Sequence, residues 1–134
     1  MKSVYLIDTD WIIDQLNGVN KIRQRLKEFR PFGLAISIIS VAELYEGVYY
    51  SNNQTLSQHM LDELLAQFEI LAIDDEICKI FGRERGILRR NGMILSDFDL
   101  LIASTCLRWN LTLLTNNRKH FAHMAGLKMI PESK

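Results

Sequence analysis

The chain has 134 residues, 48% of them hydrophobic and 24% charged, which is the length and balance of one compact globular domain. Sixteen Lys and Arg side chains offset sixteen Asp and Glu side chains, and this zero net charge excludes a general nucleic-acid coat without excluding a nucleic acid as substrate. Two Cys and two Pro exclude a disulfide scaffold and a Pro-rich linker, and the longest apolar stretch is too short to cross a membrane, so we expect a cytoplasmic protein with reduced thiols.

Short apolar runs alternate with amphipathic segments along the chain. The runs predict strands at residues 4–7, 34–37, 70–73, 111–114 and 128–130. Apolar side chains at helical spacing predict helices at residues 11–16, 22–29, 41–50, 56–68, 77–88 and 98–109. Strands that are separated by helices indicate an α/β fold with a central parallel sheet, in a single domain that spans residues 1–134.

The cysteines and histidines give little indication of a site of their own. Cys78 and Cys106 both fall in apolar helical patterns, so we predict two thiols in the core. His59, His120 and His123 are predicted on the surface. His120 and His123 have metal-like spacing, but two His without a third ligand are weak support for a zinc site.

Acidic and amide side chains stand where a parallel sheet builds its site. Ligands bind beyond the carboxyl ends of the strands in such a sheet. The side chains expected there are Asp8 after the first strand, Glu43 in the first turn of the helix after the second, Asp97 and Asp99 at the start of the buried helix, and Asn116 and Asn117 after the fourth strand. Gathered carboxylates repel one another, and a hard divalent cation relieves that repulsion.

Each of these polar residues also has a purely structural interpretation. Ser40 and Glu43 have the spacing of a capping box, and Ser96 and Asp99 match a looser version of it. Asp10 fits the N-cap of the helix at 11–16, which is the role we favour for it. Asp8, Asn116 and Asn117 all fit turns at strand ends. Asp99 is the hardest to explain this way, because a carboxylate on a buried helix is costly unless it is paired or coordinated.

Four motifs occur in order along the chain: LIDTD at residues 6–10, SIISVAEL at 37–44, DFDLLIAST at 97–105 and LLTNN at 113–117. With these motifs the chain resembles the PIN-domain family of Mg²⁺-dependent ribonucleases, and within it the VapC-like toxins of toxin–antitoxin pairs. The resemblance covers essentially the whole chain. It implies an α/β/α sandwich and an endoribonuclease.

The resemblance also assigns roles to residues. It implies metal ligands at Asp8, Glu43 and Asp99, which are then the catalytic residues, with Asp97 as an accessory ligand and Asn117 as a further candidate ligand. Thr9, Ser40 and Asn116 match positions that line the site. Many members carry an Asp where this chain has Asn117, which leaves one metal ion or two as open alternatives.

The activity implied by the resemblance is RNA hydrolysis. Mg²⁺ or Mn²⁺ held by the carboxylates would orient and acidify a water at the scissile phosphate. The expected partners are the RNA substrate, a second copy of the chain and an antitoxin that blocks the active-site groove, with DNA reached only through the antitoxin. A basic group at Arg83, Arg85, Arg89 and Arg90 is expected to contact RNA phosphates, although a solvated helix face is the simpler interpretation.

Two other functions compete with this interpretation. Asp8 and Asp10 follow a strand in the D-x-D pattern of haloacid-dehalogenase-like phosphotransferases, although Ile12 stands where that pattern usually has Thr or Val. A catalytically inactive PIN-like module that only binds a partner is the second competitor. A housekeeping RNA-processing nuclease is a milder variant of the main hypothesis.

Overall fold

The computed structural model describes residues 3–130, which form one five-stranded sheet between two groups of helices. The strands are β1 Tyr5–Ile7, β2 Leu34–Ser37, β3 Glu69–Leu71, β4 Thr112–Leu114 and β5 Lys128–Ile130. Their order is β3-β2-β1-β4-β5, and every neighbouring pair is parallel. The predicted α/β fold with a central parallel sheet is confirmed. Residues 1–2 and 131–134 of the predicted domain lie outside the described residues.

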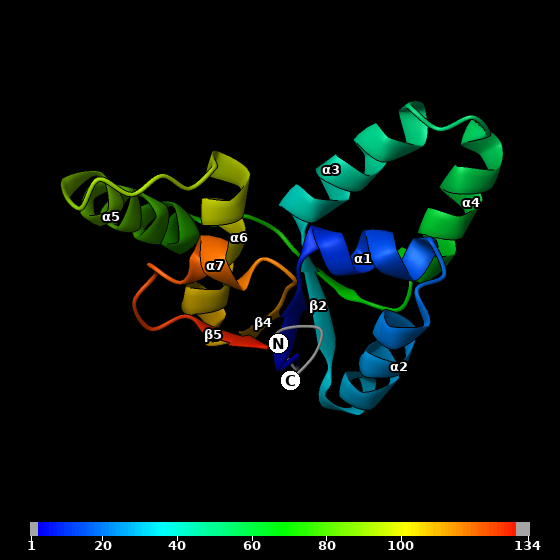
Figure 1. The fold of residues 1–134 in the computed structure, drawn as a ribbon, viewed down its shortest axis with the longest axis horizontal. Helices are drawn as coiled ribbons and strands as arrows, with labels where there is room; N and C mark the ends of the chain where they lie inside the picture. The colour runs from blue at the N-terminus through cyan, green and yellow to red at the C-terminus, as the bar shows by residue number, and fades with distance from the viewer. Residues whose placement is uncertain (1–2, 131–134) are drawn as a thin grey trace.

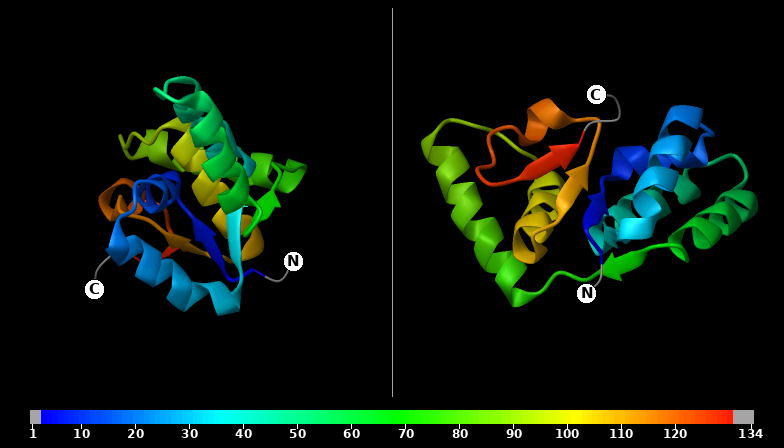
Figure 2. Two further views of the ribbon diagram at one scale, coloured as in Figure 1. Left: turned by 90° about the vertical axis from the view of Figure 1, so that its right-hand side faces the viewer. Right: turned by 90° about the horizontal axis from the view of Figure 1, so that it is seen from below.

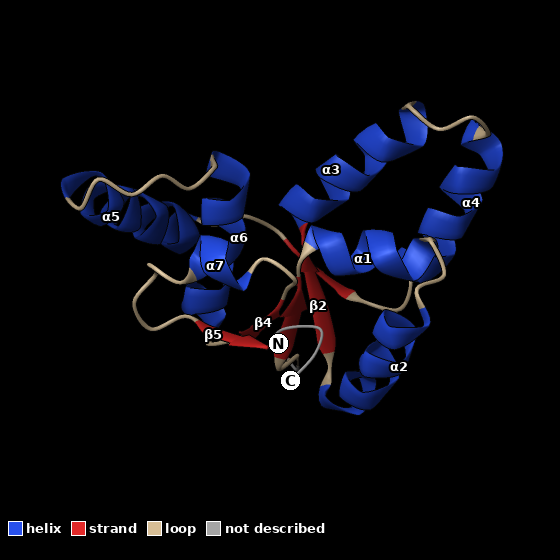
Figure 3. Ribbon diagram, in the orientation of Figure 1, coloured by secondary structure: helices blue, strands red, loops and turns tan. Residues whose placement is uncertain are grey.

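The helices cover both faces of the sheet. They are α1 Thr9–Leu16, α2 Asn20–Phe29, α3 Ile38–Tyr49, α4 Gln54–Leu65, α5 Asp75–Arg90, α6 Asp97–Trp109 and α7 Arg118–Phe121, with a short 3₁₀ turn at Arg30–Phe32. Figures 1 and 3 show α1–α4 on one side of the strands and α5–α7 on the other, and Figure 2 shows the same layers from two further directions. Among the described residues, none of these helices has the length and apolar content needed to cross a bilayer.

A separate hydrophobic core fills each side of the sheet. Trp11 of α1, Ile22 of α2 and Leu61 of α4 meet on one face, whereas Leu100 of α6 and Phe121 of α7 meet on the other. The central strands carry both cores because successive side chains of a strand point to opposite faces. This is why the short strands read as continuous apolar runs.

Local capping fixes where the helices begin. Asp74 caps α5 by accepting a hydrogen bond from Ile77 N at 2.8 Å, and acids in the first turn and arginines in the last turn of α5 complement the helix dipole. Arg108 of α6 donates to the other Asp74 oxygen at 3.2 Å. The packing of α6 against α5 is therefore tied at the start of α5.

Two predicted helix starts were wrong. Helix α3 begins at Ile38 with Ser37 as its N-cap, so Ser40 lies inside the helix, Glu43 lies beyond its first turn, and the capping-box interpretation of this pair fails. Helix α1 begins at Thr9 and is capped by Asp8, so the predicted N-cap role of Asp10 is also wrong. Ser37, the last residue of β2, and Asp8, the residue after β1, therefore cap the next helix directly.

Two smaller features differ from the predictions made from the sequence. Cys106 is buried as predicted, but Cys78 is exposed, because it points away from the face of α5 that carries the buried Ile77 and Leu88. Helix α7 was not predicted, since it is a single turn with three basic residues and only Phe121 buried.

Candidate active site

The candidate site lies at the carboxyl ends of β1, β2 and β4, where the connections to α1, α3 and α7 start. Asp8 follows β1, Glu43 projects from α3, and Asp99 projects from the first turn of α6. These three carboxylates interact: the charges of Glu43 and Asp99 both raise the pKa of Asp8, and the charge of Asp99 raises the pKa of Glu43. The fold thus brings together three residues that are 35 or more positions apart in sequence.

Asp8 is fixed by hydrogen bonds to both of its carboxylate oxygens. It is 3% exposed, Oδ1 accepts from Thr9 N at 2.8 Å, and Oδ2 accepts from the hydroxyl of the buried Thr115 at 2.7 Å. Burial raises the pKa of Asp8 to about 6, against the lowering effect of these two hydrogen bonds and with smaller increases from Asp99 and Glu43. Asp8 is therefore a pre-positioned carboxylate, and within residues 3–130 no basic side chain neutralises its charge.

Thr9 connects Asp8 to Glu43. Its backbone N–H donates to Asp8 Oδ1, and its hydroxyl donates to Glu43 Oε1 at 2.7 Å. The same hydroxyl lies 2.8 Å from the hydroxyl of the fully buried Ser40. Burial, followed by the charge of Asp99, raises the pKa of Glu43, while the Thr9 hydroxyl lowers it. Thr9 and the buried Ser40 therefore lie beside the carboxylate of Glu43, and their lining role stays a prediction.

Asp99 is more open than the buried Asp8. Its backbone N–H donates to Ser96 Oγ at 3.2 Å, so Ser96 is the N-cap of α6, and the Asp99 side chain is 25% exposed. Asp99 Oδ2 lies 3.6 Å from Nδ1 of His120, whose side chain is 65% exposed. Sequence reasoning placed His120 on the surface but missed this approach, because it depends on the unpredicted helix α7.

Asp97 and Arg85 are bonded to each other rather than facing the cluster. Arg85 Nη2 lies 2.6 Å from Asp97 Oδ1, and Arg85 Nη1 donates to the backbone oxygen of Leu95 at 2.7 Å. The Asp97 side chain is 79% exposed and that of Arg85 only 17%. Arg85 thus bridges α5 to the start of α6.

The other three arginines of the basic group differ in their surroundings. The Arg83 side chain is 63% exposed, although its Nε lies 3.1 Å from the buried carboxylate of Glu84, and Arg89 and Arg90 are exposed at the end of α5. Three of the four arginines are therefore exposed, as the RNA-contact prediction requires, and Arg85 is not.

Asn116 and Asn117 face α1 rather than the carboxylate cluster. The backbone N–H of Asn116 and the side-chain amide of Asn117 both donate to Asp10 Oδ2, at 3.0 and 3.1 Å. The Asn116 side-chain amide donates to Asp14 Oδ2 at 3.0 Å. Burial, and then the charge of Asp8, raises the pKa of Asp10 to about 7. The adjacency of β1 and β4 creates these contacts, and no local signal in the sequence pointed to them.

The donor set suits a hard divalent cation. Oxygen ligands are what Mg²⁺ and Mn²⁺ prefer, and unneutralised charge is already concentrated at Asp8 and Glu43. Within residues 3–130, no group of three or more His, Cys, Asp and Glu side chains is gathered tightly enough to hold an ion by itself. Mg²⁺ commonly keeps several waters and takes one or two protein carboxylates, so the residues fit an ion of this kind.

The same geometry disfavours a phosphotransferase that uses Asp8 as nucleophile. Asp10, the second acid of the D-x-D pattern, is bonded to Asn116 and Asn117 instead of facing a leaving group.

Comparisons with known proteins agree with the motifs. The model of the PIN domain matches residues 5–127. The chain is 35% identical over 130 residues to ribonuclease VapC1 of Methanocaldococcus jannaschii, covering 96% of this chain and 88% of that protein. It is 38% identical over 129 residues to ribonuclease VapC2 of Rickettsia felis, covering 92% and 94% respectively.

Solved structures give the same result for the fold. The chain superimposes on the crystal structure of VapBC2 from Rickettsia felis bound to a promoter DNA fragment, with a TM-score of 0.90, 31% identity and coverage of 95% of this chain and 97% of that one. The structure of VapBC-1 from nontypeable Haemophilus influenzae matches with a TM-score of 0.88, 29% identity and coverage of 97% and 98%.

Proposed function

Because the chain belongs to the PIN-domain family, we propose that it is an endoribonuclease and the toxin of a toxin–antitoxin pair. The observation that carries the proposal is the convergence of Asp8, Glu43 and Asp99 from three separate elements, with Thr9 bonded to two of them. Relatives at 35% and 38% identity over nearly the whole chain are named ribonucleases, which supports the same activity here.

We propose that Asp8, Glu43 and Asp99 hold Mg²⁺ or Mn²⁺, which when bound supplies charge neutralisation at the scissile phosphate and acidifies a water. Thr115 and Thr9 keep the carboxylates of Asp8 and Glu43 oriented before any ligand arrives. Asp99, as the partly exposed acid, faces the side from which substrate enters. Asp97 is left out of this ligand set because Arg85 neutralises it.

RNA is held by phosphate contacts at the rim. Arg89 and Arg90 at the end of α5 are exposed, and α7 adds Arg118 and Lys119 close to the site. Such contacts give affinity without sequence selection. They need only a local basic patch, which is compatible with an overall charge of zero.

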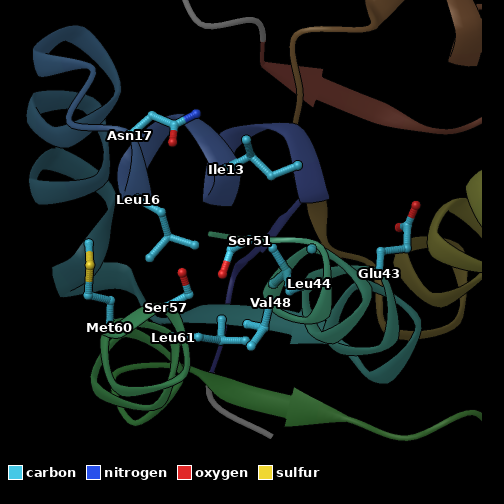
Figure 4. Close-up of a pocket in the computed structure, with 11 residues that line it drawn as sticks. Ile13, Leu16, Asn17, Glu43, Leu44, Val48, Ser51, Ser57, Met60 and Leu61 are labelled. Carbon is cyan, nitrogen blue, oxygen red and sulfur yellow. The ribbon is translucent and has the colours of Figure 1, made fainter. Parts of the chain in front are cut away.

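The antitoxin is proposed to occupy the groove beside Glu43. A cavity of about 390 Å³ lies between α1, α3 and α4, lined by apolar side chains that include Leu16, Leu44 and Met60, with Glu43 at one end (Figure 4). An apolar peptide segment fills such a cavity, and a positive charge on that segment complements Glu43. The structural neighbours that are VapBC complexes support a partner of this kind.

A second copy of the chain is proposed to pack on the outer face of α3. Ile38, Ala42, Tyr45 and Tyr49 recur at helical spacing on this face, and all four are exposed. An aromatic and apolar stripe of this kind is typical of a protein interface. Light scattering of wild type and Tyr45→Ser tests it, since a dimer through this face predicts dissociation in the variant.

Expression of the chain with and without Asp99→Asn tests the nuclease. We expect growth arrest and new RNA 5′-phosphate ends with the wild type, and neither with Asp99→Asn. Asp97→Asn is the matched control, because it removes a carboxylate from the same helical turn that is bonded to Arg85, and it should arrest growth like the wild type. Equal behaviour of wild type and Asp99→Asn would overturn the proposal.

A further inference from the structure

The connection after β4 is bonded to α1 more extensively than a turn requires. Asp10 Oδ2 accepts two N–H groups, from Asn116 and Asn117, and Asp14 Oδ2 accepts a third from the Asn116 side chain. We call these four residues (Asp10, Asp14, Asn116 and Asn117) the loop clamp. The contacts join positions 102 to 107 residues apart. They connect the segments that follow the neighbouring strands β1 and β4.

The loop clamp is continuous with the hydrogen bonds on Asp8. The backbone N–H of Asn117 donates to Thr115 Oγ1 at 2.9 Å, and that hydroxyl donates its own proton to Asp8 Oδ2 at 2.7 Å. A hydroxyl that receives a hydrogen bond and passes one on has a fixed direction. The orientation of Asp8 therefore depends on where residue 117 is held.

The same loop sets the start of α7. The backbone N–H of His120 donates to the carbonyl oxygen of Asn117 at 2.9 Å, and the His120 side chain approaches Asp99. A shift of Asn117 is thus transmitted to two of the three clustered carboxylates. It reaches Asp8 through Thr115 and Asp99 through α7.

We propose that Asp10 and Asp14 are positioning residues, which hold the Asn116–Asn117 loop against α1 and thereby orient Asp8 for the reaction. The inference rests on the proposed nuclease function and assigns Asn116 and Asn117 to the loop clamp rather than to a metal ion. It also gives a role to the second acid of the D-x-D pattern, which the reaction itself does not use.

The hydrogen-bond pattern predicts that an amide can replace the Asp10 carboxylate. Both donors converge on Oδ2, whereas Oδ1 is buried and, within the part of the chain that the structure describes, has no hydrogen-bond partner. Asp10→Asn keeps an oxygen for the two donors and removes the charge. Asp10→Ala removes the acceptor altogether.

The test combines amide hydrogen exchange at Asn116 with steady-state cleavage of RNA, for the wild type, Asp10→Ala and Asp10→Asn. We expect Asp10→Ala to speed the exchange of the Asn116 N–H and to lower kcat, each about tenfold, while KM changes less than about threefold. Asp10→Asn should restore both quantities to within about threefold of the wild type. Asp14→Ala, which removes one contact, should produce a smaller change of the same sign.

Asp62→Ala is the matched control, because Asp62 is a helical acid that accepts a bond from Gln58 at 2.7 Å and lies on α4 away from the site. The proposal is overturned if Asp10→Ala exchanges and cleaves like the wild type, or if Asp10→Asn is as impaired as Asp10→Ala. If the wild type itself cleaves no RNA, the proposed function fails, and the exchange at Asn116 still decides the loop clamp on its own.

Discussion

The two walls of the acidic cluster are built differently. On one wall, Asp8 is 3% exposed and both of its oxygens accept hydrogen bonds from Thr9 and Thr115. On the other, Asp99 is 25% exposed and its carboxylate lies 3.6 Å from the exposed His120. The fold itself sets the position of one carboxylate and leaves the other free to adjust to a ligand.

This difference follows from the place of each residue in the sheet. Asp8 directly follows the central strand β1, which lies between β2 and β4. Asp99 starts a helix after the loop at residues 91–96, where Ile94 is 94% exposed. A buried, fully bonded carboxylate costs stability when it is charged, whereas an open one does not.

The largest expected effect is a pH-dependent stability that comes from the Asp8 wall. The pKa of Asp8 is raised from 3.8 to about 6, so the folded state holds this proton more tightly than the unfolded state. The resulting penalty is absent below the unfolded pKa and complete above the folded one. From about pH 8 to about pH 5, we expect the proton taken up by Asp8 alone to add about 1.4 kcal/mol to the unfolding free energy of the metal-free protein. Asp10, whose pKa is raised to about 7, adds a further gain of the same sign.

The variants Asp8→Asn and Asp99→Asn show how much each carboxylate contributes to the pH dependence of the unfolding free energy. Asn is also a good N-cap, so Asp8→Asn should stabilise the metal-free protein by about 1–2 kcal/mol at about pH 8. It should also make the pH profile shallower, leaving the part that comes from Asp10. Asp99→Asn should change stability by less than about 0.5 kcal/mol. Mn²⁺ should stabilise the wild type at about pH 8, since its charge favours ionised carboxylates. A profile for Asp8→Asn that rises toward low pH as steeply as the wild type would contradict the assignment.

The sequence predicts the surroundings of the buried Asp8, the closed wall of the site, better than those of the partly exposed Asp99, its open wall. The strand at residues 4–7 and the acid after it could be predicted, because a buried parallel strand is an apolar run and its carboxyl end is where ligands bind. Glu43 was expected in a first turn but lies further along α3, because Ser37 rather than Ser40 starts that helix. The motif located the acid although the local structure around it was misjudged.

The rest depends on contacts between distant segments. Nothing near Asp10 shows that Asn116 and Asn117 will donate to it, since the contact exists only because β1 and β4 are neighbours. Arg85 looked like its neighbouring arginines, and only the packing of α5 on α6 joins it to Asp97. Periodicity indicates which face of a helix is apolar, but not what a polar side chain meets across the fold.

A smaller effect is expected from Thr115→Val, which keeps the shape of the side chain and removes the hydroxyl between Asn117 N and Asp8 Oδ2. We expect a loss of about 1–2 kcal/mol of unfolding free energy and about tenfold weaker Mn²⁺ binding in calorimetry, because Asp8 loses a fixed donor. Thr105→Val is the matched control: Thr105 is equally buried, and its hydroxyl bonds to Leu101 O of its own helix rather than to a site residue. Equal Mn²⁺ affinities in the two variants would show that Thr115 does not orient Asp8.

The smallest effect is expected on the open wall, from Arg85→Gln. Arg85 holds Leu95 O and Asp97 at the start of α6, so its loss should cost about 1 kcal/mol and loosen the turn that carries Asp99. Arg89→Gln, on the exposed end of α5, should leave stability within about 0.5 kcal/mol while reducing the salt dependence of RNA binding. Two measurements then distinguish the arginines. Thermal melting should detect the loss of Arg85, and the salt dependence of RNA binding should detect the loss of Arg89. If Arg85→Gln instead lowers the salt dependence and leaves melting unchanged, its bridge to α6 does not support the open wall and Asp99 is held by α6 alone.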